Sequence, residues 1–185
     1  MKNLETERYL LRKPRMEDAE DIYEKWGKDT EKTAEYRNCC AHKNIIETKA
    51  LLKTAINESE FGTPSWFIEE KQTNVVIGYV KIFVCSEKNK NCEITFYFLE
   101  KWRTDFSPEE VLTAVIRHLF TDEIFDTIVV KFYDRSEEDT KIFETILNNI
   151  GMKKEGTLRN RMIDSNGQKI NRIVYSILKE EFISK

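Results

Sequence analysis

The sequence has 185 residues, of which 40% are hydrophobic and 34% are charged. This composition is sufficient for one buried core and excludes a mainly disordered chain. Thirty Lys and Arg side chains oppose thirty-three Asp and Glu side chains, for a formal net charge of −3, and no basic block indicates a nucleic-acid partner. The first residues lack the apolar segment of a signal peptide, and the longest apolar runs, such as 75–79, are too short to cross a bilayer. We therefore expect one cytoplasmic domain spanning residues 1–185, with no membrane partner.

Four cysteines and two histidines occur in the chain. The spacing of Cys39, Cys40, Cys85 and Cys92 fits no zinc motif, so we expect reduced thiols and no metal site. Cys85 and Cys92 flank the polar turn 86–91, where they could face each other across a hairpin. A redox role for the vicinal pair Cys39 and Cys40 stays open.

The first third of the chain alternates between strand and helix patterns. Residues 4–13 combine apolar and β-favouring side chains and predict a first strand. Apolar residues at helical spacing then predict helices over 16–26 and 46–56. The segment 31–43 between them is irregular.

The middle of the chain predicts an antiparallel meander followed by a helix. Strand patterns cover 65–70, 75–85 and 92–99 and are separated by short polar turns. Ser107 is a suitable N-cap residue, and Pro108 suits the first helical position. The apolar stripe of the following helix indicates a buried crossover between two strands in a βαβ-like unit.

The last third predicts a strand, a capped helix and a hairpin. Residues 124–133 form an apolar strand pattern, and Ser136 and Gly151 delimit a helix as its N-cap and its C-terminal glycine. A strong turn sequence at 164–167 separates two further strand patterns. The expected fold class is α/β (α+β): a mixed, mostly antiparallel, twisted sheet of about seven strands with about four helices.

Several motifs resemble the GNAT superfamily of acetyl-coenzyme A-dependent N-acyltransferases, in particular the branch that acetylates protein N-termini, including those of ribosomal proteins. The opening segment 4–12 and the following Glu-Asp-Ala at 17–19 are similar to the start of that branch. The segment 76–79 resembles its third strand, 150–159 is close to its C-terminal motif, and 174–179 resembles its closing strand. The likeness covers nearly the whole chain. It implies the GNAT fold, acetyl-CoA as co-substrate and an amine as acceptor.

The resemblance places the coenzyme pyrophosphate at the loop before the Ser107 helix. The family motif there is Q/R-x-x-G-x-G/A, whose glycines let backbone N–H groups approach the phosphates. In this chain Arg103 and Asp105 occupy the two glycine positions. The Asp105 carboxylate would repel a phosphate, whereas Arg103 could pair with one. The expected coenzyme-binding residues of this loop are Trp102, Arg103, Thr104, Asp105, Phe106 and Ser107.

The resemblance also implies contacts to the rest of the coenzyme. The backbone N–H that holds the acyl carbonyl falls by position on Phe98 or Leu99. The family's Asn and Ser pair on the next helix falls on Thr140 and Phe143. Thr140 could hydrogen-bond the pantetheine arm, whereas Phe143 cannot donate a proton and is expected to pack in the core.

Direct acetyl transfer needs a base for the amine and an acid for the departing thiolate. By position Glu93 is the candidate base and Tyr97 the candidate acid. Each has a structural alternative, a solvated strand-end glutamate and a packed tyrosine. His118 lies opposite the apolar stripe of its helix and is expected at the surface. His42 lies near the vicinal cysteines, but no third group is visible to orient a Cys-His nucleophile.

Three functions are compatible with these residues. The first is an N-acyltransferase that moves an acetyl group from acetyl-CoA to a primary amine of a small molecule or a protein N-terminus. The second is a catalytically silent GNAT-fold binding or regulatory module that has lost normal acetyl-CoA binding, which the missing glycines, Asp105 and Phe143 favour. The third keeps the cleft for a less anionic ligand. The sequence favours the first function and leaves open the acceptor, the acyl group and the choice between monomer and homodimer.

Overall fold

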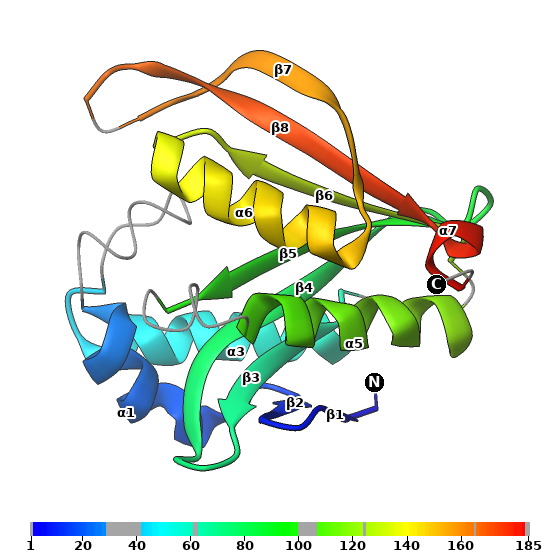
Figure 1. The fold of residues 1–185 in the computed structure, drawn as a ribbon. Helices are drawn as coiled ribbons and strands as arrows, with labels where there is room; N and C mark the ends of the chain where they lie inside the picture. The colour runs from blue at the N-terminus through cyan, green and yellow to red at the C-terminus, as the bar shows by residue number, and fades with distance from the viewer. Residues whose placement is uncertain are drawn as a thin grey trace. The chain divides into compact units, whose positions relative to one another are not determined.

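The computed structural model of the chain describes residues 2–28, 42–60, 63–99, 107–123, 125–164 and 166–183 (Figure 1). Within them, eight strands form one open sheet in the order β1-β2-β3-β4-β5-β6-β8-β7. β5 and β6 pair in parallel, whereas β1–β2, β2–β3, β3–β4, β6–β8 and β7–β8 are antiparallel pairs. This mixed, mostly antiparallel sheet confirms the expected fold class. The chain divides into two compact units, one of Met1–Ile82 with Phe96–Trp102, the other of Phe83–Thr95 with Arg103–Lys185.

The first unit contains the N-terminal strands and helices. Its elements are β1 (Leu4–Glu5), β2 (Tyr9–Arg12), the 3-10 turn Met16–Asp18, α1 (Ala19–Ile22), the π-helical turn Tyr23–Gly27, α3 (Ile45–Glu60), β3 (Ser65–Glu70), most of β4 (Val75–Ser86) and the end of β5 (Asn91–Phe98). The three helical turns between residues 16 and 27 are continuous, so they confirm the helix expected there.

The expectation of a single strand over residues 4–13 was wrong. The segment folds as a small hairpin in which β1 and β2 pair antiparallel, with Leu4 opposite Leu11. The cause is a local turn, because the Thr6 hydroxyl accepts a hydrogen bond of 3.0 Å from the Tyr9 backbone N–H. A threonine side chain that bonds the backbone in this way offers it an alternative to continuous strand geometry.

The core of the first unit lies where its helices meet the sheet. Side chains from α1, α3, β3, β4 and the end of β5 form one buried cluster, which Ile45 and Tyr79 border. The cluster consists of Ala19, Ile22, Leu52, Phe67, Val76, Tyr97 and Leu99. The C-terminal end of β5 is therefore fixed by packing against α1 and α3.

The second unit contains the C-terminal strands and the longest amphipathic helices. Its elements are the tip of β4, the start of β5, α5 (Ser107–Thr121), β6 (Thr127–Tyr133), α6 (Glu137–Ile150), β7 (Lys153–Ile163), β8 (Lys169–Leu178) and α7 (Lys179–Ile183). The parallel pairing of β5 with β6 through α5 confirms the expected crossover. The pairing of Ile163 with Lys169 confirms the C-terminal hairpin.

The ends of α6 follow from its sequence. The Ser136 hydroxyl accepts a hydrogen bond of 3.0 Å from the Asp139 backbone N–H, and Gly151 ends the helix at φ 97°. The apolar face between these caps packs on the strands, where the Phe143 ring lies 5.2 Å from that of Phe132 on β6. Both caps and the buried face match the sequence prediction.

The described residues contain eight strands and five α-helices, against about seven and about four expected from the pattern. The extra strand comes from the split of the first strand pattern, and α7 is a five-residue helix too short to produce a periodic signal. No helix among the described residues is both long and apolar enough to traverse a bilayer.

Candidate functional site

The end of β5 directs alternate backbone groups to its two edges. The Leu99 N–H donates to the Ile77 carbonyl on β4 over 2.8 Å, so this amide is engaged within the sheet. Successive residues of a strand send their N–H groups to opposite edges. The N–H of Phe98 therefore points away from β4. Of the two amides expected to bind the acyl carbonyl, the geometry favours that of Phe98.

The parallel pairing of β5 does not extend as far as this amide. The register of β5 with β6 runs from Asn91 opposite Thr127 to Ile94 opposite Val130. Phe98 lies four residues beyond the last of these pairs along β5. Backbone donors beyond the end of a ladder need another partner, such as water or a ligand.

Gly78 on β4 allows the backbone of β5 to pass at very short range. A Cβ atom built on Gly78 would lie 2.1 Å from the carbonyl oxygen of Tyr97 and 3.1 Å from the Cα of Phe98. No side chain fits there unless β5 moves, because the obstacle is backbone. In the sequence Gly78 is recognisable only as part of the family-like segment 76–79, because the close approach to β5 has no local sequence signal.

Tyr97 is the candidate acid, and its ring is packed. The side chain is 4% exposed and belongs to the core cluster of the first unit. Its ring stacks on that of Tyr79 with 5.9 Å between centroids. These contacts are the ones expected for the structural alternative, in which Tyr97 is packed in the core.

Glu93 is the candidate base, and it is held in an ion-pair network within the second unit. Its carboxylate accepts a hydrogen bond of 2.9 Å from Arg172 on β8 and a second one from Lys131 on β6. Its side chain is only 14% exposed, so it is not the solvated strand-end glutamate of the alternative. The two cationic partners were missed in the sequence because only the pairing of three strands brings them together.

Thr140 and Phe143, one turn apart on α6, have contrasting environments. The Thr140 hydroxyl oxygen is buried and has no hydrogen-bond partner among the described residues. Phe143 is 9% exposed and packs against Phe132. An unsatisfied buried hydroxyl costs about 1–3 kcal/mol, so Thr140 is well suited to bind a ligand. Phe143 is a core residue.

The coenzyme loop is only partly described. Ser107 is the first residue of α5 and is fully buried. The other expected residues, Trp102, Arg103, Thr104, Asp105 and Phe106, lie outside the described residues. The role of this loop therefore stays a prediction.

Comparison with known proteins decides the family. A family model described as "Acetyltransferase (GNAT) domain" matches residues 8–146, which is most of the chain. The chain belongs to the GNAT acetyltransferase family. It is 28% identical to the uncharacterized N-acetyltransferase YoaA of Bacillus subtilis, over 95% of this chain and 96% of that protein.

Solved structures agree with this GNAT fold. A ribosomal-protein-alanine acetyltransferase from Vibrio fischeri matches with a TM-score of 0.80 at 16% identity, over 98% of this chain and 99% of that one. The microcin self-immunity acetyltransferase MccE, solved in complex with acetyl-CoA and AMP, matches with a TM-score of 0.79 at 16% identity, over 93% of each chain. At such identities the likeness shows the fold alone.

Both histidines of this GNAT domain have a side-chain partner close by in the sequence. The expectation that His118 is at the surface was wrong, because its side chain is 7% exposed and its Nδ1 lies 3.0 Å from Asp122 on the next helical turn. A carboxylate four residues later supplies the polar partner that allows burial. His42 Nδ1 lies 2.8 Å from the hydroxyl oxygen of Thr48, which is in the N-terminal half of α3. Cys39 and Cys40, its proposed neighbours, lie outside the described residues.

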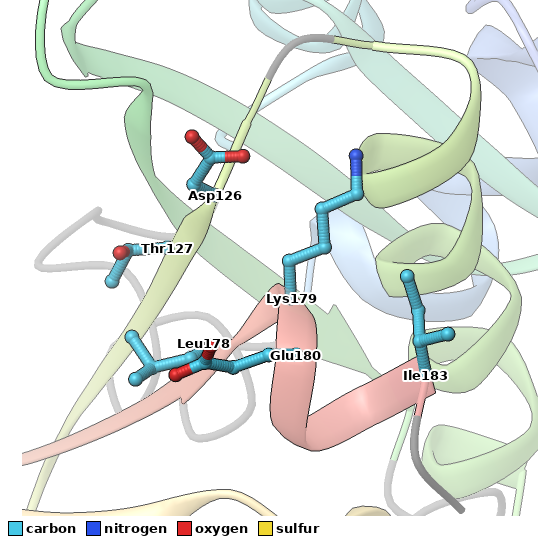
Figure 2. A pocket seen from close by; sticks show the side chains of 6 residues that line it. All are labelled: Asp126, Thr127, Leu178, Lys179, Glu180 and Ile183. Carbon is cyan, nitrogen blue, oxygen red and sulfur yellow. The ribbon is translucent and has the colours of Figure 1, made fainter.

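Figure 2 shows a pocket in the second unit of the GNAT domain, with a volume of about 660 Å³. It lies at the junction of β6, β8 and α7 and is lined by Asp126, Thr127, Leu178, Lys179, Glu180 and Ile183. None of these residues is among the site residues predicted from the sequence. The described part of the chain contains no cluster of three His, Cys, Asp or Glu side chains able to hold a metal ion.

Proposed function

We propose that the chain is an N-acetyltransferase that moves the acetyl group of acetyl-CoA to a primary amine. The observation that carries this proposal is the backbone geometry at the end of β5. There the Leu99 N–H bonds to the Ile77 carbonyl on β4, so strand alternation directs the Phe98 N–H to the other edge. The backbone around it passes close to Gly78. Membership of the GNAT family supports the same reaction.

The contacts to the coenzyme are assigned by family position, residue by residue. The Phe98 N–H would donate to the acetyl carbonyl oxygen, and the buried Thr140 hydroxyl would hydrogen-bond the pantetheine arm. Arg103 would pair with a phosphate and partly offset the repulsion from Asp105. When bound, acetyl-CoA supplies an acetyl group activated as a thioester.

The chain would assist transfer mainly through a fixed donor. The Phe98 N–H stabilises the negative charge that develops on the carbonyl oxygen while the amine nitrogen bonds to the carbonyl carbon and the carbon–sulfur bond breaks. Removal of one such donor typically costs 10²–10³ in rate. Glu93 would accept the amine proton through water, because its carboxylate is already bonded to Lys131 and Arg172. Tyr97 is the candidate proton donor to the thiolate.

The acceptor is a small-molecule amine or a protein N-terminus. The ribosomal-protein-alanine acetyltransferase of the same fold supports the second option by analogy only. A direct test incubates the purified protein with acetyl-CoA and a panel of small amines and peptides and detects acetylated products by mass spectrometry. We expect at least one product that carries an added acetyl group on an amine. Absence of any product from a panel that covers both acceptor classes would contradict the proposal.

A catalytically silent binding module is the second candidate, and the engagement of both Glu93 and Tyr97 favours it. The variant Asp105→Gly separates the two functions, because it restores a glycine at the coenzyme loop. A native chain that binds no acetyl-CoA while Asp105→Gly does bind it would identify the silent module. Binding and turnover by the native chain would identify the enzyme.

A further inference from the structure

Strands β6 and β8 place cationic side chains around one aromatic ring in the second unit. Tyr133 on β6 lies directly opposite Arg172 on β8, and the Arg172 guanidinium lies over the Tyr133 ring at 5.5 Å from its centroid. Lys131 precedes Tyr133 by two residues, so it shares the same face of the strand. The Arg135 guanidinium lies 6.0 Å from the centroid of the same ring. We call these four residues the basic cluster.

The basic cluster carries more positive charge than its bonded carboxylate neutralises. Glu93 bonds both Lys131 and Arg172, so two cations share one anion and leave a formal charge of +1. Arg135 places a further guanidinium beside the ring, and it is left out of this balance because it has contacts of its own. In a chain whose formal net charge is −3, this excess is local, and it favours an anionic ligand.

The guanidinium of Arg172 has a donor that the described residues do not satisfy. Its Nη2 donates to Glu93, whereas its Nε is buried and has no hydrogen-bond partner. The side chain as a whole is 32% exposed, so a small ligand can reach other parts of it. Native proteins satisfy most buried donors with protein, water or a bound group. A planar guanidinium matches the two oxygens of a carboxylate or phosphate.

We propose that the basic cluster binds an anionic group of the acceptor, so that the preferred substrate is a primary amine that also carries a carboxylate or a phosphate. This inference rests on the proposed function, because it names the substrate class of the same reaction. The Arg172 guanidinium would donate paired hydrogen bonds to the two oxygens of the anionic group, and the Lys131 ammonium would attract it as a point charge. The Tyr133 ring lies under the guanidinium and keeps its orientation. Glu93, the candidate base, borders the same cluster and would face the amine of such a molecule.

The binding site can be tested without acetyl transfer. Succinate and inorganic phosphate serve as probes in a titration at constant ionic strength, followed by the nitrogen–proton NMR signal of the Arg172 Nε group. The signal is assigned by its loss in Arg172→Gln. We expect a saturable shift of this signal with at least one probe. A signal that does not move at high probe concentration would overturn the proposal.

A second experiment, on acceptor specificity, tests whether the basic cluster binds the acceptor during acetyl transfer. Acetyl transfer is compared for matched pairs that differ by one carboxylate, β-alanine with β-alaninamide and acidic peptides with their amidated forms of the same sequence, which also separates small acids from peptides. We expect the acidic member of each pair to have a kcat/KM at least about tenfold higher, through a lower KM. The reason is that a hydrogen bond to a charged group typically strengthens binding by about this factor. Arg172→Gln and Lys131→Met should remove this preference, and Arg172→Lys should keep part of it.

Two controls separate the possible failures. Arg161→Gln removes the same charge from an exposed position on β7 and should leave the preference unchanged, and thermal unfolding shows whether each variant is folded. Equal use of acidic and neutral amines, or an equal loss of both in Arg172→Gln, would mean that the cluster only joins strands and would overturn the proposal. Anion binding at Arg172 without any acetyl transfer would retain the site and overturn the proposed function.

Discussion

Gly78 shows how one residue sets the geometry of the site. Because an added Cβ would lie 2.1 Å from the Tyr97 carbonyl oxygen, Gly78→Ala must displace the backbone of β5. We expect a loss of about 1–3 kcal/mol in the free energy of unfolding, as for other overpacked positions. The rate of acetyl transfer should fall further than stability explains, since the Phe98 amide moves. Denaturant unfolding combined with kcat/KM measures both effects, and an Ala variant with unchanged turnover would show that the β4–β5 approach has no role in transfer.

The two described cysteines differ in their chemistry. Burial, together with the nearby Cys85 thiol, raises the pKa of Cys92 to about 12, whereas Cys85 is exposed. Because the thiolate is the reactive form, iodoacetamide at pH 8 should alkylate Cys85 in the folded protein and leave Cys92 unmodified. Peptide mass spectrometry distinguishes the two positions. Equal modification of both would show that β5 opens readily at this end.

The same shift predicts how stability changes at alkaline pH. The Cys92 thiol has an ordinary pKa of 9.0 and a folded-state pKa of about 12, so the unfolded chain releases this proton first. Its contribution to folding is complete below pH 9 and is lost as pH rises toward 12. Cys92→Ala removes the titrating group, so the difference in unfolding free energy between the native chain and the variant should shrink over this range. A difference independent of pH would contradict the assignment.

At the scale of elements, a buried ion network joins β2, the turn before α1 and β3. Arg12 bonds both Asp18 oxygens, at 3.0 and 2.7 Å, and Glu69 at 2.6 Å. Burial lowers the pKa of Arg12, but its hydrogen bonds to Asp18 and Glu69 outweigh this and raise it overall. Arg12 and Asp18 are 3% and 7% exposed.

Breaking this network should be costly. We expect Asp18→Asn to lower the free energy of unfolding by about 1.5–3 kcal/mol, because the buried Arg12 loses one of its two counter-charges and keeps only Glu69. Asp21→Asn is the matched control, since Asp21 pairs with Lys25 at the surface and should change stability by less than about 1 kcal/mol. Urea unfolding of both variants tests the comparison, and similar losses would show that the network contributes little.

Elements whose signals are local were predictable from the sequence. The helix between Ser136 and Gly151 followed from its caps and its apolar face, and the last hairpin followed from its turn residues. The first strand was misjudged because one threonine hydroxyl turns the backbone. His118 was misjudged because helical periodicity does not account for a carboxylate partner that compensates burial.

At the scale of the whole molecule, the sequence identified the family through motifs spread along the chain, and the family model confirms it. The sequence predicted which positions contribute to the site, but not how their backbone groups and side chains are arranged. The choice of Phe98 over Leu99 depends on which edge of β5 meets β4, and the basic cluster depends on the pairing of β6 with β8. Such long-range pairings leave no local pattern in a single sequence. The division into two units, with β4 and β5 contributing to both, is likewise a property of the folded chain.

The most direct test of the central claim is a calorimetric titration of the native chain with acetyl-CoA, with Thr140→Val and Thr145→Val alongside. We expect micromolar binding by the native chain. Thr140→Val should bind about fivefold more weakly, since it loses one neutral hydrogen bond. Thr145→Val should bind normally, because the Thr145 hydroxyl is exposed and bonds its own helix. No binding heat at millimolar acetyl-CoA would contradict the claim that this GNAT domain uses the coenzyme.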